Sequence, residues 1–282
     1  MKKGLILEGG AMRGLFTAGV IDVLMENGIE FDGAVGVSAG AAFGVNYKSK
    51  QIGRVLRYNT RFARDKRYCG LGVLLKTGNL YSTEFCYNEV PLVHDVFDFD
   101  TYEKHPMEFY VVATDVETGK PVYHKFEGRH DCGFDWIRAS ASMPLVSQIV
   151  DIKGQKLLDG GIADSVPIKF FENMGYDKNV VILTRPKTYR KGENKAMPLI
   201  KLKYRKYPNL VETMKNRHKV YNDTLDYIEE REKSGNIFVI RPEADLPIDR
   251  VERDPVKLKA AYEIGRETAI SRLEEIKSYL CI

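Results

Sequence analysis

The sequence contains few of the residues that would build a zinc site or a network of disulfides. Its four cysteines are scattered along the chain at Cys69, Cys86, Cys132 and Cys281. None of them stands in a C-x-x-C pair, so neither a zinc ligand set nor a disulfide framework is indicated. Unpaired thiols of this kind are typical of a reduced, cytosolic protein.

Long apolar runs are also missing. The apolar run Leu5–Leu7, which follows two lysines near the N-terminus, is interrupted at once by Glu8. It is too short for the hydrophobic region of a signal peptide. No stretch approaches the roughly 18 apolar residues that a membrane-spanning helix needs. We therefore expect a cytoplasmic protein, either free or held peripherally on the inner face of the membrane.

The excess of positive charge is small but unevenly distributed. The formal net charge is +4, and no nucleic-acid recognition motif accompanies it, so no nucleic-acid partner is expected. Residues 185–219 nevertheless carry twelve Lys and Arg against Glu193 and Glu212. This segment is either a solvated helix surface or a contact with an anionic membrane, where each such charge contributes about 1 kcal/mol. A second basic segment, residues 51–66, is expected to be a helix with a solvated face.

The length and the hydrophobic content favour one large α/β domain. The chain has 282 residues, of which 44% are hydrophobic, and this is enough to bury a sizeable core. No repeat or low-complexity linker divides it. We expect a single domain over residues 1–282, with a basic helical C-terminal part from about residue 186. The sequence does not indicate an oligomeric state.

A serine stands at the centre of the most informative motif. Gly36-Val37-Ser38-Ala39-Gly40 fits G-x-S-x-G, between an apolar strand at 33–37 and a small-residue helix that begins at Ala39. In this motif a sharp turn from strand to helix holds the serine above the sheet edge, and the glycines remove side chains that would collide. Ser38 is therefore a candidate nucleophile at the positive end of a helix. The alternative is an ordinary glycine-rich turn with an N-cap serine.

A glycine-rich loop precedes this motif. Residues 9–14, Gly-Gly-Ala-Met-Arg-Gly, follow a buried strand and precede a helix, so that unpaired amides face outward together. The loop lacks the Lys of a nucleotide-binding P-loop and the G-x-G-x-x-G spacing of a dinucleotide site. The amides of Gly10 and Ala11, with Arg13 adding charge, could instead stabilise an oxyanion. A simple helix-capping turn is the alternative.

A candidate base lies later in the chain. Asp159 ends an apolar strand and is followed by Gly160 and Gly161, so its carboxylate could reach the sheet edge where Ser38 stands. The competing partner would be a histidine, in the order of the α/β-hydrolase triad. The only histidine after Asp159 is His218, which stands in the basic segment KNRHK, and this favours a Ser38/Asp159 dyad.

Apolar periodicity and turn residues predict the remaining elements. We expect further strands at 109–114, 122–126 (as a hairpin with the strand before it), 156–158, 179–184 and 236–241. We expect further helices at 82–90, 134–142, 168–174, 210–233 and 255–280.

These motifs together resemble the patatin-like phospholipase family over about residues 4–184. The resemblance includes VVATDVETGK at 111–120 and RASASMP at 138–144. It implies a three-layer α/β/α fold with a mainly parallel sheet, hydrolysis of lipid acyl esters, and no metal or cofactor. It also implies site residues: nucleophile Ser38, base Asp159, and an oxyanion loop of Gly9, Gly10, Ala11, Arg13 and Gly14. The chain departs from the family where Ala11 replaces a usual glycine and where Gly161 stands at a position often taken by alanine.

The function expected from this resemblance is that of a serine acyl hydrolase. Its substrates would be phospholipids, lysophospholipids or other lipid esters, with possible contact to an anionic membrane. An acyltransferase of similar layout and a non-catalytic lipid-binding protein remain as alternatives. The headgroup and the acyl chain length are open, because the segments that form the pocket walls have no recognisable motif.

Overall fold

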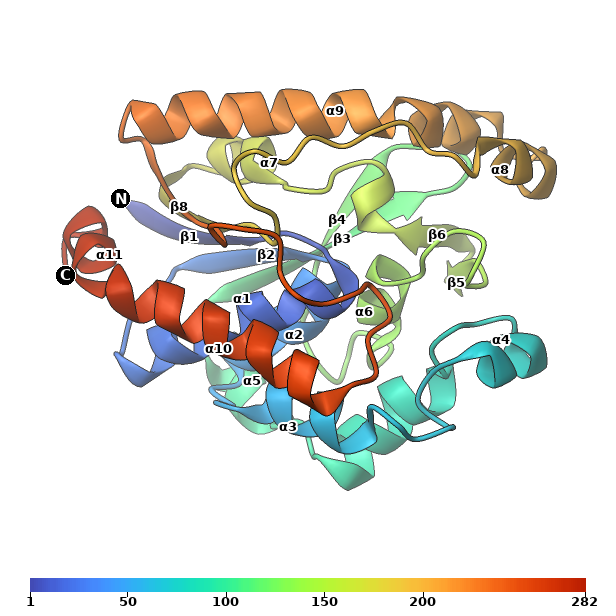
Figure 1. Cartoon of the computed structure of the whole chain (residues 1–282), viewed down its shortest axis with the longest axis horizontal. Helices are drawn as coiled ribbons and strands as arrows, with labels where there is room; N and C mark the ends of the chain where they lie inside the picture. Colours follow the sequence, from blue (N-terminus) through green and yellow to red (C-terminus); the bar gives the residue numbers. More distant parts are fainter.

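Eight strands form one mixed sheet at the centre of the fold (Figure 1). The computed structural model describes all residues from 1 to 282. The strand order is β5-β6-β3-β2-β1-β7-β8, with β4 paired to β3 outside this path. The strands are β1 (Lys2–Leu7), β2 (Gly33–Val37), β3 (Glu108–Asp115), β4 (Pro121–Lys125), β5 (Val150–Ile152), β6 (Gln155–Asp159), β7 (Tyr176–Ile182) and β8 (Ile237–Ile240). The run from β3 to β8 is parallel, whereas β4, β5 and β6 pair in antiparallel fashion.

Helices connect the strands and cover the sheet. They are α1 (Gly14–Glu26), α2 (Ala39–Lys48), α3 (Arg54–Phe62), α4 (Leu71–Thr77), α5 (Phe99–Lys104), α6 (Asp135–Ser140), α7 (Ile168–Asn173), α8 (Met197–Lys203), α9 (Pro208–Lys233), α10 (Pro255–Ser271) and α11 (Leu273–Leu280). Short turns η1 (Ala11–Arg13) and η3 (Gly160–Ile162) and a π-type segment η2 (Phe85–His94) complete the set. None of the helices combines the length and the apolar character that crossing a bilayer requires.

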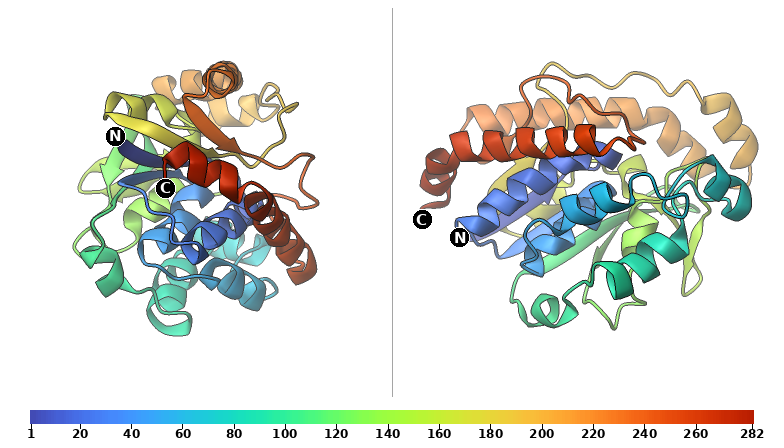
Figure 2. Two further views of the ribbon diagram at one scale, coloured as in Figure 1. Left: turned by 90° about the vertical axis from the view of Figure 1, so that its left-hand side faces the viewer. Right: turned by 60° about the horizontal axis from the view of Figure 1, so that its bottom comes forward.

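The two faces of the sheet are buried against different helices. Leu5 and Leu7 of β1 belong to a core that includes residues of α1, α2, α6 and α10, whereas Ile6 faces residues of α7 and α9. Successive side chains of a strand point to opposite faces, so both faces of β1 are apolar because both are covered. Figures 1 and 2 show α7 and α9 on one side and α1, α2 and α10 on the other. The prediction of a three-layer α/β/α fold with a mainly parallel sheet is confirmed.

The register of the strands brings the motifs together. Leu7 of β1 pairs with Gly36 of β2, so the glycine-rich loop begins beside the serine turn. On the other side of β2, Val37 pairs with Val112 of β3. The antiparallel strand β6 ends at Asp159, which pairs with Ala113, the residue after Val112. Three chain segments that are distant in sequence therefore end at one edge of the sheet.

Several element predictions need correction. The strand β5 and the helices α4, α5 and α8 were not predicted. The helix expected at 255–280 is two helices, because Arg272 leaves helical dihedral angles (φ −112°, ψ 13°) and binds the carbonyl of Val239 at 2.6 Å. The helix expected at 82–90 is shifted to the π-type segment η2, although the Ser82 hydroxyl accepts a hydrogen bond from the Phe85 amide at 3.2 Å.

The interpretation of residues 51–66 as a solvated basic helix is wrong for part of its surface. The helix α3 is amphipathic and buries Val55, Tyr58 and Phe62. Arg54 is buried as well. Its guanidinium donates to the Asn46 side chain at 2.9 Å and forms an ion pair with Asp95 at 3.4 Å. A buried arginine needs such partners, which the charge count alone could not reveal.

Candidate active site

Ser38 occupies a strained turn between β2 and α2. Its backbone angles are φ 54° and ψ −120°, a region that residues with a Cβ rarely adopt. A Cβ built on Gly36 would lie 2.5 Å from the carbonyl oxygen of Gly40, and one built on Gly40 would lie 2.4 Å from the carbonyl oxygen of Leu7. Both glycines are therefore required for this turn.

Ser140 holds the turn from the other side. Its hydroxyl oxygen accepts a hydrogen bond from the Ser38 amide at 2.8 Å. Ser140 lies in α6, within the RASASMP segment. Sequence reasoning noted that segment but assigned no role to Ser140. The bond uses the Ser38 amide and thereby orients the turn that presents the Ser38 side chain.

Asp159 lies beside Ser38 and is almost completely buried. Its residue exposure is 6%, and one carboxylate oxygen accepts from the Gly161 amide at 2.8 Å. Burial raises the pKa of Asp159, while Arg217, a hydrogen bond from Ser38 and the Gly161 amide act in the opposite direction. The desolvated carboxylate is therefore a stronger base than an aspartate in water.

The two glycines after Asp159 have separate reasons to be glycines. A Cβ built on Gly160 would lie 2.1 Å from the carbonyl oxygen of Val112, so a side chain would push β6 away from β3. A Cβ built on Gly161 would lie 3.1 Å from an Asp159 carboxylate oxygen and 3.2 Å from the Arg217 guanidinium. Arg217 also donates from Nε to the Gly161 carbonyl. In this chain, Arg217 fills the space that an alanine at 161 would need.

The glycine-rich loop presents free amides next to Ser38. The amides of Gly9, Gly10 and Ala11 have no acceptor within the protein, whereas that of Gly14 is bonded to the carbonyls of the preceding turn. A Cβ built on Gly9 would lie 3.0 Å from the Ser38 Cβ. Ala11 is held at φ 50°. Gly14 lets the loop pack closely against α2, because a Cβ built on it would lie 2.9 Å from the Ala39 Cβ.

Arg13, within this loop, has a buried side chain. Its exposure is 9%, and its Nε has no hydrogen-bond partner. Burial lowers the pKa of Arg13, and the nearby Arg185 lowers it further. Arg13 makes no ion pair that would neutralise it, so its charge is available to whatever occupies the site.

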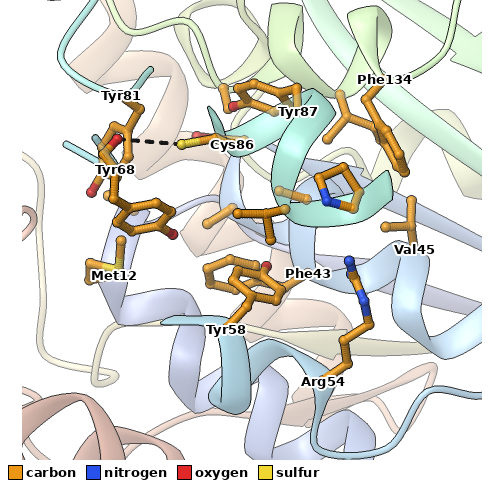
Figure 3. Close-up of a pocket in the computed structure, with 18 of the residues that line it drawn as sticks. Met12, Phe43, Val45, Arg54, Tyr58, Tyr68, Tyr81, Cys86, Tyr87 and Phe134 are labelled. Carbon is orange, nitrogen blue, oxygen red and sulfur yellow. Dashed lines mark hydrogen bonds between the residues drawn. The ribbon is translucent and has the colours of Figure 1, made fainter. Parts of the chain in front are cut away.

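An apolar cavity opens on one side of Ser38 (Figure 3). Its volume is about 120 Å³. Figure 3 shows aromatic side chains around it, with Phe43 and Tyr58 facing Tyr87 across the space. The lining is Ala11, Met12, Ser38, Ala39, Ala42, Phe43, Val45, Arg54, Tyr58, Tyr68, Tyr81, Cys86, Tyr87, Val90, Pro91, Phe134, Ile137, Ala141 and Met143. These walls come from α2, α3, η2 and α6 and suit a hydrocarbon chain.

A larger, polar cavity opens on the other side of Ser38. Its volume is about 270 Å³, and Ala11, Ser38 and Met143 are common to both cavities. Asp159 lines only this second cavity, together with the loop residues Gly9, Gly10 and Arg13. The hydroxyl and the carboxylate that the sequence singled out thus lie at the junction of an apolar space and a polar one.

His218 is not part of this arrangement. It lines neither cavity, and its Nδ1 lies 3.1 Å from the carbonyl oxygen of Lys215 on its own helix, α9. The basic residues of segment 185–219 that do reach the polar cavity are Arg185, Lys191 and Arg217. Neither a solvated helix surface nor a membrane contact, the two alternatives expected for residues 185–219, describes these three positions.

Comparison with known proteins shows which family this chain resembles in sequence. A family model described as patatin-like phospholipase matches residues 5–171, and a domain of unknown function (DUF6363) matches residues 207–281. The uncharacterized protein YjjU of Escherichia coli (strain K12) is 28% identical over 282 residues, covering 93% of this chain and 74% of YjjU. Lysophospholipase nte1 of Aspergillus terreus is 31% identical over 181 residues, which are 62% of this chain and 11% of that protein. The solved structure of VipD from Legionella pneumophila aligns with a TM-score of 0.49 and 14% identity, over 97% of this chain and 67% of that one.

Proposed function

Because the chain belongs to the patatin-like phospholipase family, we propose that it is a serine hydrolase that cleaves carboxylic esters of lipids through Ser38 and Asp159. The family membership inferred from the three motifs is confirmed. The sequence relatives include a lysophospholipase, of which this chain spans about a tenth. The substrates proposed here are therefore phospholipids, lysophospholipids or related lipid esters.

The reaction proposed for this site has two steps. Asp159 accepts the proton of Ser38 as the hydroxyl oxygen attacks the acyl carbonyl, and the free amides of Gly10 and Ala11 stabilise the resulting oxyanion. The alcohol leaves with the proton held by Asp159, and the acyl group stays on Ser38. Asp159 then takes a proton from water as the water oxygen attacks the acyl-serine ester. It returns that proton to the Ser38 oxygen as the ester bond breaks and the fatty acid leaves.

The observation that carries the proposal is the strained serine facing a desolvated carboxylate. The combination of φ 54° and ψ −120° at Ser38 is a strained conformation of the kind that is concentrated at active sites. The raised pKa of Asp159 suits a general base. Placement of Ser38 at the junction of the two cavities supports an ester whose acyl chain enters the apolar side and whose alcohol lies on the polar side.

Two variants test this mechanism. Ser38→Ala and Asp159→Asn are each expected to lower hydrolysis of a short-chain acyl ester by at least about a thousandfold while the circular dichroism spectrum is retained. A fluorophosphonate probe should label wild-type protein at Ser38 and leave the Ser38→Ala protein unlabelled. Ser278→Ala, at an exposed serine, is the matched control. A folded Ser38→Ala protein that still turns over substrate would refute the assignment.

We further propose that one end of the molecule contacts an anionic membrane. In α4, Leu71 and Leu75 are 74% and 87% exposed, and in α8 Leu199 and Leu202 are exposed as well. These two helices lie at the same end of the molecule in Figures 1 and 2. Lys201 and Lys203 lie in the same turn as Leu202 of α8, so basic and apolar groups that suit an anionic bilayer occur together there.

A further inference from the structure

The polar cavity beside Ser38 carries an excess of positive charge. Five basic side chains line it, against only two carboxylates. The basic residues are Arg13, Arg185, Lys191, Arg217 and Arg250, and the acidic ones are Glu8 and Asp159. Buried or half-buried charges are normally balanced by opposite charges nearby, so this imbalance needs an explanation.

The two carboxylates offset only part of this positive charge. Glu8 accepts hydrogen bonds from the Tyr221 hydroxyl at 2.5 Å and from the amide and hydroxyl of Thr184 at 2.6 and 3.1 Å. Asp159 accepts from the Gly161 amide at 2.8 Å. Neutral donors therefore occupy both acids.

Four of the five basic residues make no ion pair. Only Arg185 does, with the exposed Asp245 at 2.6 Å. The Nε atoms of Arg13 and Arg185 are buried without an acceptor. The pKa of Lys191 is lowered to about 7, mainly by burial and then by the charges of Arg217, Arg250 and Arg13, against the opposing effect of Glu8. The positive charges of these side chains repel one another, and the protein supplies too few negative charges to balance them. An anionic ligand would supply the missing negative charge.

The same cavity is poorly suited to a quaternary ammonium group. Such groups bind over aromatic rings, and the cavity contains Tyr189 and Tyr221. Their faces are already taken by basic side chains of the protein. Lys191 lies over the Tyr221 ring at 4.1 Å, and Arg185 lies over the Tyr189 ring at 4.5 Å. A choline headgroup would meet positive charge where it needs a free ring.

From these contacts we propose that the polar cavity binds the phosphate of the substrate's alcohol part, and that the preferred substrate is an acylglycerol ester with a phosphomonoester headgroup. The inference rests on the function proposed above, because it uses Ser38 as the reacting group. Guanidinium and ammonium groups are the usual ligands of phosphate. A phosphomonoester brings up to two negative charges to a cavity that lacks them.

The residues that would recognise the headgroup lie mostly outside the region that defines the family. Arg185, Lys191, Arg217 and Arg250 all follow residue 171, where the match to the patatin-like model ends. Arg217 and Arg250 lie within residues 207–281, the domain of unknown function. The C-terminal part of the chain would therefore supply headgroup specificity to the catalytic part.

Three soluble esters with the same short acyl chain test the proposal. They are 1-acylglycerol, 1-acylglycerol 3-phosphate and 1-acylglycero-3-phosphocholine, assayed as monomers at pH 6.5. Wild-type kcat/KM should be at least tenfold higher for the phosphate ester than for the glycerol ester, and lowest for the choline ester. Lys191→Met with Arg250→Met should raise KM for the phosphate ester at least tenfold and abolish the preference. Lys219→Met, which removes an exposed charge of α9, should retain it.

Several outcomes would overturn the inference. The inference is wrong if the wild-type protein cleaves the phosphate ester no better than the glycerol ester. It is also wrong if the folded double variant keeps the preference for the phosphate ester. Glycerol 3-phosphate should also bind to the inactive Ser38→Ala protein by calorimetry, and more weakly when Lys191 and Arg250 are replaced. If inorganic phosphate binds equally well and the phosphate ester is not preferred, the cavity holds a free anion and the headgroup assignment is wrong.

The results with the three esters distinguish an error in this inference from an error in the proposed function. Suppose that the wild-type protein hydrolyses the glycerol ester, that Ser38→Ala does not, and that the phosphate ester is not preferred. This result would support the proposed function and reject only the headgroup site. Absence of hydrolysis of all three esters would reject the function itself. Calorimetry would then test the anion site independently, and no binding of glycerol 3-phosphate would reject that site too.

Discussion

The backbone at Ser38 stores strain that a glycine would relieve. Its φ of 54° with ψ −120° costs a residue with a Cβ about 1–3 kcal/mol. Ser38→Gly should therefore unfold with a free energy about 1 kcal/mol higher than Ser38→Ala, after allowing for the greater unfolded-state entropy of glycine. Both variants lack the hydroxyl, so urea denaturation of the pair isolates the backbone term. Equal stabilities would mean that the turn is relaxed at this position.

Arg217 is expected to set the acid limb of the pH profile. Asp159 must be ionised to accept the Ser38 proton, so activity falls as the pH drops through its pKa. Burial raises that pKa, and Arg217 is the largest influence that lowers it. Removing the charge in Arg217→Met should raise the pKa of Asp159 and move the acid limb of kcat/KM to higher pH.

The matched variant for this prediction is Arg217→Lys. Both replacements remove the Nε bond to the Gly161 carbonyl, but only the lysine keeps the positive charge. The acid limb of Arg217→Lys should therefore stay close to that of wild type when the pH profile is measured on a neutral ester. Identical shifts in the two variants would show that the lost hydrogen bond, and not the charge, is responsible.

At the level of secondary structure, burial decided which elements could be predicted. The strand β2 and the start of α2 match the expected residues because a strand buried on both faces is apolar throughout. The short elements β5, α5 and α8 contain too few residues for a period to show. The G-x-S-x-G motif and the first glycine of the D-G-G motif were recognisable because a Cβ at Gly36, Gly40 or Gly160 would collide with backbone atoms.

The basic cavity could not be predicted from the count of charges. A charge count does not say which side chains turn inward. One signal was present, since Arg217 continues the buried stripe of α9 at helical spacing. The stripe consists of Leu210, Met214, Tyr221, Leu225 and Ile228. An arginine within such a stripe indicates a buried partner or ligand site rather than a solvated face.

The exposed leucines of α8 should control binding to vesicles. Leu199→Gln with Leu202→Gln removes the apolar contact while keeping the lysines, so sedimentation with anionic liposomes should fall several-fold at low salt. Val256→Gln, at an exposed apolar residue in α10, is the control and should bind like wild type. High salt should weaken binding of the wild-type protein because the lysines contribute through charge. Equal binding to neutral and anionic vesicles would contradict the proposed contact.

At the scale of the whole molecule, the two segments matched by separate family models share one sheet and one layer of helices. Strand β8 extends the sheet by pairing with β7. Helix α10 packs on α1, where Tyr262 donates to Asp22 at 2.6 Å and Arg266 pairs with Glu26 at 2.8 Å. The sequence analysis predicted a single domain, and we propose on these contacts that the chain unfolds as one cooperative unit.

The crossing of α1 and α10 offers a test of that cooperativity. The helices approach at two glycines: a Cβ built on Gly265 would lie 2.0 Å from the carbonyl oxygen of Phe16, and one built on Gly19 would lie 2.1 Å from that of Tyr262. Because the obstruction is backbone, Gly265→Ala must separate the helices and should lower stability by about 3 kcal/mol. In calorimetry, a single transition should move down by about 6 °C or more.

The control for this variant is Gly72→Ala in α4. A Cβ at Gly72 would meet nothing within 4 Å, so the substitution should raise stability by about 0.5–1 kcal/mol, since alanine loses less entropy than glycine in a helix. Ester hydrolysis in the Gly265→Ala protein should be lost on heating along the same curve as the circular dichroism signal, although residue 265 lies far along the chain from Ser38. Two separate transitions, with hydrolysis retained to the wild-type Tm, would mean that the C-terminal helices unfold independently of the catalytic part and that the proposal of a single cooperative domain is wrong.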